Sequence, residues 1–195
     1  DGASIKFTGV AVHPGFAKNR MVNALKYAAR FIEKLPADER PENTEGRQGF
    51  YHMTDLSGNA SEARLSMILR DFEVDKLKVR GETVKRIAKE LMDEEPRLKV
   101  SVEITETYRN MAYWLKDRPE ITEKLLEAVE ACGITPQALP IRGGTDGSGL
   151  TAKGLPTPNI FAGGLNFHGP REWISTRVMA FAVCTVLNLV QGWAE

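Results

Sequence analysis

The chain has 195 residues, 42% of them apolar, which is enough for one large or two small domains with a sizeable core. It carries 26 basic and 26 acidic residues, so no charge imbalance favours nucleic acid or an acidic membrane as a partner. The N-terminal residues show no signal peptide, and no uninterrupted apolar run is long enough to span a bilayer. Cys132 and Cys184 lie in apolar helical patterns and favour free thiols over a disulfide. We therefore expect a soluble cytoplasmic protein.

The first half begins with a strand, a helix and a hairpin. Residues 5–8 alternate between apolar and polar side chains, as a half-buried strand does. The helix that follows ends at Pro36 and has one apolar face. That face consists of Met21, Val22, Leu25, Ala28, Ala29, Ile32 and Leu35. Residues 50–53 and 64–70 then predict a hairpin with its turn near residues 57–59.

A second helix and a fourth strand complete the first domain. The helix has an apolar face made by Leu77, Val84, Ile87, Ala88 and Leu91. Residues 99–105 alternate cleanly in polarity and predict the strand. The resulting order, βαββαβ, predicts four antiparallel strands with two helices on one face of the sheet. We expect this domain to span residues 1–107.

The second half, residues 108–195, contains too few predicted elements to bury its own apolar surface. Pro119 opens a helix, and short strand-like segments follow at residues 138–141 and 159–161. The last helix, at residues 172–193, is apolar on most faces and needs cover on nearly all sides. Two helices and two short strands cannot supply that cover. We therefore expect this half to be a piece of a larger α/β domain, with apolar surface exposed when it is isolated.

His168 has the position of a metal ligand but lacks obvious partners. It follows an apolar segment, residues 158–164, that ends in two glycines. A histidine just past such a strand end is a common place for a catalytic ligand. The chain contains three histidines in all, whereas a catalytic zinc needs about three protein ligands plus water. His168 alone therefore cannot form such a site.

The other two histidines have different contexts. His13 stands in the sequence VHPG after the first strand. A histidine braced by Pro-Gly can project into a neighbouring site and donate a hydrogen bond to a carbonyl or an oxyanion. The competing interpretation is a turn residue with a solvated ring. His52 lies within a strand without a partner nearby in sequence, and we interpret it as structural.

Arg142 opens the glycine-rich sequence RGGTDG. The glycines let the backbone approach a ligand closely, and a guanidinium group is suited to bidentate binding of a carboxylate. A phosphate-binding loop is disfavoured because its Lys-Ser/Thr pair is absent. The alternative is a tight turn with a structural Arg–Asp pair.

Two further positions remain open at this level. Arg70 ends the third strand next to Asp71, and an exposed salt bridge is the default interpretation of that pair. Asn110 sits where the two halves join, as a hinge or as a substrate contact. No Ser-His-Asp order, Cys-x-x-Cys or His-Glu-x-x-His motif is present. Together the candidates indicate a site for an anionic small molecule, with metal-assisted hydrolysis as one option.

Ten short segments, which cover nearly the whole chain in order, carry a specific resemblance. They are VHPG at 12–15, MVNA at 21–24, LPADE at 35–39, GFYH at 49–52, ILRDF at 68–72, NM at 110–111, IRGGTDG at 141–147, GLP at 154–156, PNIF at 158–161 and NFHG at 166–169. With these segments the chain resembles the peptidase T family. Its members are tripeptide aminopeptidases among the di-zinc exopeptidases, which also include aminoacylases and glutamate carboxypeptidases.

The resemblance implies a fold, a reaction and residue roles. It implies a catalytic α/β domain with two zinc ions and an inserted βαββαβ lid, so this chain would be the lid followed by an incomplete catalytic segment. By motif, His168 would be a zinc ligand, and His13 would stabilise the oxyanion of the tetrahedral intermediate, in some relatives across a dimer. Arg70, Asn110 and Arg142 would contact the peptide, with an arginine binding its C-terminal carboxylate. The implied reaction is zinc-dependent release of the N-terminal residue from a tripeptide.

Several motifs of that family have no counterpart here. These are its His-x-Asp motif, its bridging aspartate and the Glu-Glu pair with the general base, since Glu94 and Glu95 end a lid helix. Asp1 is not assigned as a ligand. We expect the N-terminal catalytic half to have been truncated or to lie on another chain, so that this chain alone neither hydrolyses tripeptides nor binds zinc tightly. The alternative is a non-catalytic dimerisation or peptide-binding module whose exposed sheet edge pairs with its twin.

Overall fold

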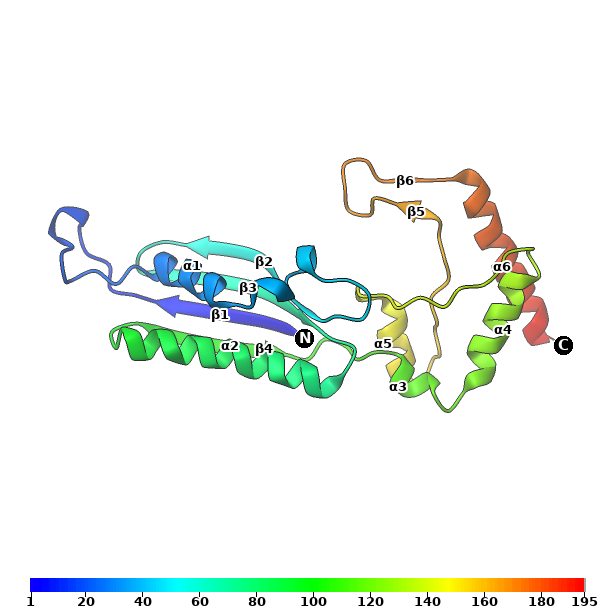
Figure 1. Cartoon of the computed structure of the whole chain (residues 1–195), viewed down its shortest axis with the longest axis horizontal. Helices are drawn as coiled ribbons and strands as arrows, with labels where there is room; N and C mark the ends of the chain where they lie inside the picture. Colours follow the sequence, from blue (N-terminus) through cyan, green and yellow to red (C-terminus); the bar gives the residue numbers. More distant parts are fainter. Residues whose placement is uncertain (195) are drawn as a thin grey trace. The chain divides into compact units, whose positions relative to one another are not determined.

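The computed structural model describes residues 1–194, which form two compact units that meet between Tyr108 and Arg109. The first unit has the expected βαββαβ order (Figure 1). Its elements are β1 (Gly2–Thr8), α1 (Ala24–Lys34), β2 (Phe50–Gly58), β3 (Glu62–Arg70), α2 (Val74–Glu94) and β4 (Lys99–Thr105), with short 3-10 turns η1 (Pro14–Phe16), η2 (Ala37–Glu39) and η3 (Pro41–Asn43). The expected α/β class with a four-stranded antiparallel sheet is confirmed.

The sheet has the strand order β2-β3-β1-β4, and every neighbouring pair is antiparallel. Ile5 in β1 lies opposite Leu65 in β3 and Val102 in β4. The edge strand β2 contains a register shift between Met53 and Asp55, whereas the edge strand β4 pairs with β1 without interruption. The two edges of the sheet are therefore different in regularity.

Both helices of this unit pack on one face of the sheet, as the apolar periodicities predict. The core side chains come from alternate positions of β1 and β3 and from the inner faces of α1 and α2. The largest fully buried ones include Phe7, Phe31, Ile5, Leu65, Leu69, Ile87, Leu91, Val22 and Val84. Helix α1 begins at Ala24 because the side-chain carbonyl of Asn23 accepts a hydrogen bond from the backbone N–H of Lys26, at 3.2 Å.

The second unit is mainly helical. Its elements are α3 (Ala112–Leu115), α4 (Pro119–Glu130), α5 (Asp146–Ala152), β5 (Gly164–Leu165), β6 (Trp173–Ile174) and α6 (Thr176–Ala194). Helices α4 and α6 pack together around Cys132, Thr185 and Asn188. The Asn188 amide donates to the sulfur of Cys132 at 3.2 Å and to that of Cys184 at 3.7 Å. Both cysteines are free thiols, as the sequence predicted, although each is half-buried.

Three sequence-based expectations for this unit are wrong in detail. Residues 138–141 and 159–161 do not form strands, since strands need hydrogen-bonded neighbours and the described residues offer them none. Leu139 is accordingly 76% exposed. The last helix begins at Thr176 rather than residue 172, because Trp173 and Ile174 pair with β5 as strand β6.

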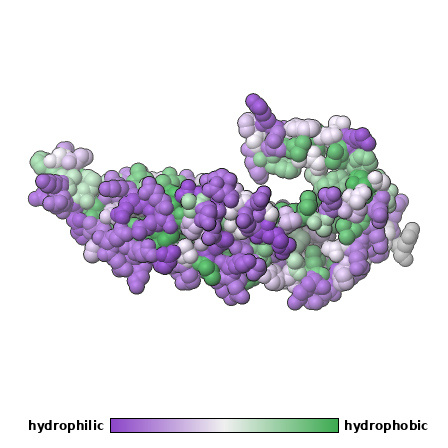
Figure 2. All heavy atoms as spheres, viewed as in Figure 1, coloured by the Kyte–Doolittle hydropathy of each residue, from purple (hydrophilic) through white to green (hydrophobic). Residues whose placement is uncertain are grey.

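Helix α6 leaves most of its apolar surface uncovered, as expected for a piece of a larger domain (Figure 2). Its exposed apolar side chains are Met179, Val183, Val186, Leu187, Val190 and Trp193. By length and composition α6 could cross a membrane, although polar residues interrupt its apolar sequence. A core helix of a soluble protein passes the same test, so these two properties do not separate the alternatives.

Candidate functional site

His13 lies on an excursion of the chain, residues 10–22, which leaves the sheet after β1 and returns before α1 (Figure 1). A two-residue bridge between Val10 and Val22 closes the base of this excursion. The Nδ1 atom of His13 accepts a hydrogen bond from the backbone N–H of Gly15 at 3.1 Å, and the imidazole lies 5.5 Å from the Phe16 ring. Because Nδ1 is an acceptor, the neutral ring carries its proton on Nε2. The exposed imidazole can therefore donate a hydrogen bond through Nε2.

Arg70 is held at the end of β3. Its guanidinium Nη1 donates to the carbonyl oxygens of Asp1 and Leu69, at 3.3 and 3.2 Å. The same group lies over the Tyr108 ring, 4.9 Å from its centroid. Burial raises the pKa of Tyr108, and the positive charge of Arg70 partly opposes that effect. These contacts fix a half-buried cation at this end of the sheet.

His13 and Arg70 lie at opposite ends of one sheet. Strands β1 and β3 are antiparallel, with Thr8 opposite Glu62. Arg70 therefore lies beside the beginning of β1, whereas His13 follows its end. Seven residues of extended strand span about 20 Å. The first unit does not bring these two residues together.

Asp71 takes part in a buried cluster rather than in the exposed salt bridge that the sequence suggested. Its side chain is 3% exposed and pairs with Arg80 of α2 at 3.1 Å, and Arg80 also binds Glu39. The Arg80 guanidinium lies 4.9 Å from the centre of the Tyr51 ring, and burial raises the pKa of Tyr51. Gly49 leaves room for the cluster, since a Cβ there would lie 2.2 Å from the Asp71 Oδ2 atom. The cluster fixes the chain directly after Arg70.

The sequence carried a signal for this cluster that we missed. Arg80 falls three residues after Leu77 and four before Val84, on the apolar face of α2. A charged residue on a buried face needs a charged partner nearby. The partner is Asp71, directly after Arg70.

Asn110 and Arg142 belong to the second unit. The Asn110 side-chain carbonyl accepts a hydrogen bond from the backbone N–H of Ala112 at 3.0 Å, which favours a turn at the start of α3. Arg142 is half-buried in the irregular segment before α5. The segments that contain Asn110 and Arg142 are neighbours, because a Cβ added at Gly147 of α5 would lie 3.5 Å from Met111 Cε.

His168 lies in the connection between β5 and β6, in a left-handed conformation with φ of 64°. Its backbone N–H donates to the Glu172 carboxylate at 2.9 Å. Asn166 is also left-handed, with φ of 59°, and its side-chain amide donates to the carbonyl oxygen of Arg171 at 3.1 Å. Such conformations are uncommon outside glycine, and these local bonds stabilise them here. The His168 side chain is exposed.

The described residues do not fit a complete catalytic metal centre. Within residues 1–194, no three His, Cys, Asp or Glu side chains lie close enough together to hold an ion. Among these residues, His168 therefore does not belong to a three-ligand cluster of the kind that a catalytic zinc needs.

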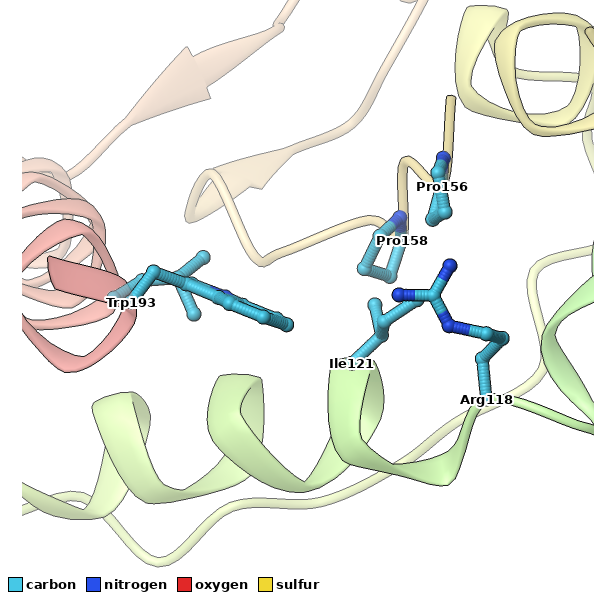
Figure 3. A pocket seen from close by; sticks show the side chains of 6 residues that line it. Arg118, Ile121, Pro156, Pro158 and Trp193 are labelled. Carbon is cyan, nitrogen blue, oxygen red and sulfur yellow. The ribbon is translucent and has the colours of Figure 1, made fainter. Parts of the chain in front are cut away.

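A shallow pocket of about 240 Å³ lies between α4 and α6 and contains none of the candidate residues (Figure 3). It is lined by Arg118, Ile121, Pro156, Pro158, Leu189 and Trp193. The Trp193 ring points from α6 into this pocket, and the Lys124 ammonium lies 4.6 Å from the centre of that ring. The pocket is mostly apolar and gives no chemistry to the candidate site.

A known protein family matches the first unit. Residues 1–98 match the family model described as the peptidase dimerisation domain, and the chain belongs to this family. The matched segment comprises β1, both helices and the hairpin between them.

Similarity to relatives continues through the second unit. A protein named peptidase T from Shouchella clausii is 48% identical over 193 residues, which cover 99% of this chain and 47% of that protein. The chain thus spans about half the length of the curated relatives it matches. The predicted resemblance to the peptidase T family is confirmed.

Solved structures share the fold at lower identity. A tripeptidase from Staphylococcus aureus aligns with a TM-score of 0.75 at 18% identity, covering 96% of this chain and 50% of that chain. An aminopeptidase PepT from Bacillus cereus aligns with a TM-score of 0.73 at 20% identity, covering 100% and 52%. A Bacillus subtilis protein described as a dinuclear metal binding peptidase of the M20 family aligns with a TM-score of 0.60 at 15% identity, covering 96% and 48%.

Proposed function

We propose that this chain forms the dimerisation domain and part of the catalytic domain of a zinc-dependent aminopeptidase that releases the N-terminal residue from tripeptides. The observation that carries the proposal is the 48% identity to a peptidase T along 99% of the chain. The fold shared with a tripeptidase and with an aminopeptidase supports the same reaction class. The remaining half of the enzyme supplies the general base and the other metal ligands.

In the complete enzyme, His168 is one ligand of a two-metal site. The dinuclear metal binding relative supports two ions, and a histidine nitrogen suits zinc. A bound zinc ion supplies Lewis-acid chemistry and an activated water. Arg70, Asn110 and Arg142 contact the peptide, with a guanidinium group binding its terminal carboxylate. The chain alone is inactive, because residues 1–194 do not complete the metal centre.

His13 acts in the active site of the other subunit. A tripeptide in extended form is about 10 Å long, whereas about 20 Å of strand separates the end of β1 from Arg70. One peptide therefore cannot contact both residues of the same domain. If both contact the peptide, they come from two copies of the chain, which agrees with the membership of a dimerisation domain family.

The regular edge strand β4 favours one way to form this dimer. β4 pairs with β1 over seven consecutive residues, whereas the register shift in β2 disturbs the other edge. Two β4 strands related by a two-fold axis through Val102 pair antiparallel and join two sheets into one. Ser101 then lies opposite the partner subunit's Glu103, without like charges facing each other.

The test uses a chimera in which these 195 residues replace the matching segment of the Shouchella clausii peptidase T. We expect the zinc-loaded chimera to release the N-terminal residue from a tripeptide, and the isolated chain to release none. A folded, dimeric chimera without activity would contradict the proposal.

Mixed dimers test the position of His13. In the chimera, His13→Ala should lower kcat roughly 10²–10³-fold, as expected for loss of an oxyanion donor. Co-expression of the His13→Ala and Arg70→Ala chimeras should restore about a quarter of the activity, since half of the random dimers contain one intact site of two. Absence of any recovery in verified mixed dimers would place His13 in its own subunit's site.

A cytoplasmic location accompanies this proposal and is supported by the two free thiols. The exposed apolar stripe of α6 is covered by the rest of the catalytic domain, which agrees with the half-length match to the relatives. Fractionation of cells that produce the chimera would test both points, because a membrane-bound chimera contradicts them.

A further inference from the structure

The backbone N–H groups of Gly9 and Ala24 donate to carbonyl oxygens of the β2–β3 turn, at 2.8 and 2.9 Å, and join the excursion that carries His13 to the sheet. At the base of the excursion, Val10 and Val22 exchange backbone hydrogen bonds of 2.8 and 3.0 Å. On its returning side, Asn19 adopts a left-handed conformation with φ of 58°. The contacts of the His13 ring described above, with Gly15 and Phe16, lie within the excursion itself. The orientation of the imidazole therefore depends on how the excursion is held.

Arg97, in the turn between α2 and β4, adds a side-chain attachment on the returning side of the excursion. Its guanidinium Nη1 donates to the carbonyl oxygens of Asn19 and Arg20, at 3.3 and 3.2 Å. These bonds connect residues 77 and 78 positions apart in sequence. They hold the strained turn at Asn19 against the end of the sheet.

Glu95 holds Arg97 in position to make these bonds. The Arg97 Nε and Nη2 atoms donate to the two carboxylate oxygens of Glu95, at 2.9 and 2.7 Å. A bidentate pair fixes the plane of a guanidinium group, which a lysine could not reproduce. Glu95, which had no counterpart in the catalytic motifs of the family, thus belongs to the attachment of the excursion.

We propose that Arg97 is a positioning residue for His13, because it fixes the excursion so that Nε2 is presented to the partner subunit's site. The inference rests on the proposed role of His13 as an oxyanion donor. Arg97 itself does not touch the substrate. Its removal changes the orientation of the donor and leaves the substrate contacts of the other residues unchanged.

The attachment is tested on the 195-residue chain by amide hydrogen exchange. The backbone N–H groups of Arg20 and Met21 both donate to the Ala17 carbonyl, at 3.0 Å. Arg97→Ala should accelerate their exchange about tenfold, the factor that corresponds to the loss of one typical hydrogen bond. Arg86→Ala is the matched control, because it removes an exposed pair with Glu90 elsewhere on α2 and should leave these amides unchanged. Equal exchange in both variants would overturn the inference.

The consequence for catalysis is tested in the chimera. Arg97→Ala should lower kcat about tenfold with little change in KM, and Arg97→Lys should recover only part of that loss. In the His13→Ala background, Arg97→Ala should cause no further loss, since the residue acts through His13. An additive loss would show that Arg97 acts independently of His13 and overturn the inference.

The two proposals fail in different ways. If His13→Ala leaves kcat unchanged, the proposed role of His13 fails, while the exchange experiment still reports on the attachment. If His13→Ala lowers kcat but Arg97→Ala changes neither kcat nor exchange, the positioning role alone is wrong.

Discussion

At the scale of single residues, burial separates the charges that stabilise the fold from charges on the surface. Asp71 and Arg80 are almost completely buried, whereas the neighbouring Asp75 and Lys78 form a pair in which the carboxylate is 94% exposed. The same kinds of side chain therefore differ in energetic weight because of burial alone. Sequence spacing did not distinguish the two pairs.

Substitution of the two aspartates measures that difference. Asp71→Asn leaves Arg80 with only part of its counter-charge and should lower the free energy of unfolding by about 3 kcal/mol. Asp75→Asn, the matched control, should change it by less than about 0.5 kcal/mol. Urea denaturation followed by circular dichroism gives both values. Equal effects would mean that the buried pair contributes no more than the exposed one.

Glu95 is expected to titrate far below an ordinary glutamate. Its hydrogen bonds to Arg97 lower its pKa from 4.5 to about 2. Because the folded-state pKa is the lower one, the stabilisation is complete above about pH 5 and is lost as the pH falls from 4.5 towards 2. Carbon NMR of the Glu95 carboxyl group should show a midpoint of about 2. A midpoint near 4.5 would show that the pair with Arg97 does not persist in solution.

Sequence motifs singled out the candidate residues, but sequence could not supply their geometry. The spacing VHPG singled out His13, yet only the contact with the Gly15 N–H assigns the proton to Nε2. Arg70 was found at a strand end, but its support by Asp1 and Tyr108 depends on contacts distant in sequence. Arg97 gave no signal, because its partners are backbone carbonyls, which every residue type provides.

At the scale of elements, apolar periodicity predicted the strands and helices whose packing neighbours lie in the same unit. The strands and helices of the first unit bury their apolar faces against one another, so their patterns were sufficient. The segments 138–141 and 159–161 have strand-like patterns but lack strand neighbours among the described residues. Secondary structure that depends on absent neighbours is not determined by local sequence.

The apolar surface that helix α6 leaves exposed can be measured by dye binding. Val183, Leu187 and Val190 form part of one exposed stripe and are 56, 60 and 63% exposed. We expect the isolated chain to bind a hydrophobic dye such as ANS, and Leu187→Lys with Val190→Lys to reduce that binding severalfold without loss of helical circular dichroism. Thr176→Lys, which adds a charge at the start of α6 but removes no large apolar side chain, is the control. Unchanged binding in the double variant would locate the dye elsewhere.

At the scale of the whole molecule, dimer formation through β4 can be tested at Ser101. A charge introduced there has opposite effects on the monomer and on the dimer. Ser101 is exposed and lies opposite Lys6 of β1. In the proposed dimer it also lies opposite the partner subunit's Glu103. A glutamate at position 101 therefore suits the monomer and disfavours the dimer, whereas a lysine does the reverse.

Sedimentation velocity of the 195-residue chain distinguishes the two substitutions. Ser101→Glu should raise the dimer dissociation constant about tenfold, since two like-charge pairs then face each other across the interface. Ser101→Lys should lower it. If both substitutions have no effect on the dissociation constant, the dimer does not form through β4.

The length of β1 has a consequence for how this domain can change over time. A deletion of one residue from β1 would turn every following side chain to the wrong face of the sheet. A deletion of two residues would preserve the faces but shorten the strand by about 7 Å. Insertions and deletions should therefore accumulate in the irregular segments between η2 and β2, whereas β1 and β3 keep a constant number of residues. In the proposed dimer, the length of β1 therefore sets the separation between Arg70, in the site of one subunit, and His13, in the site of the other.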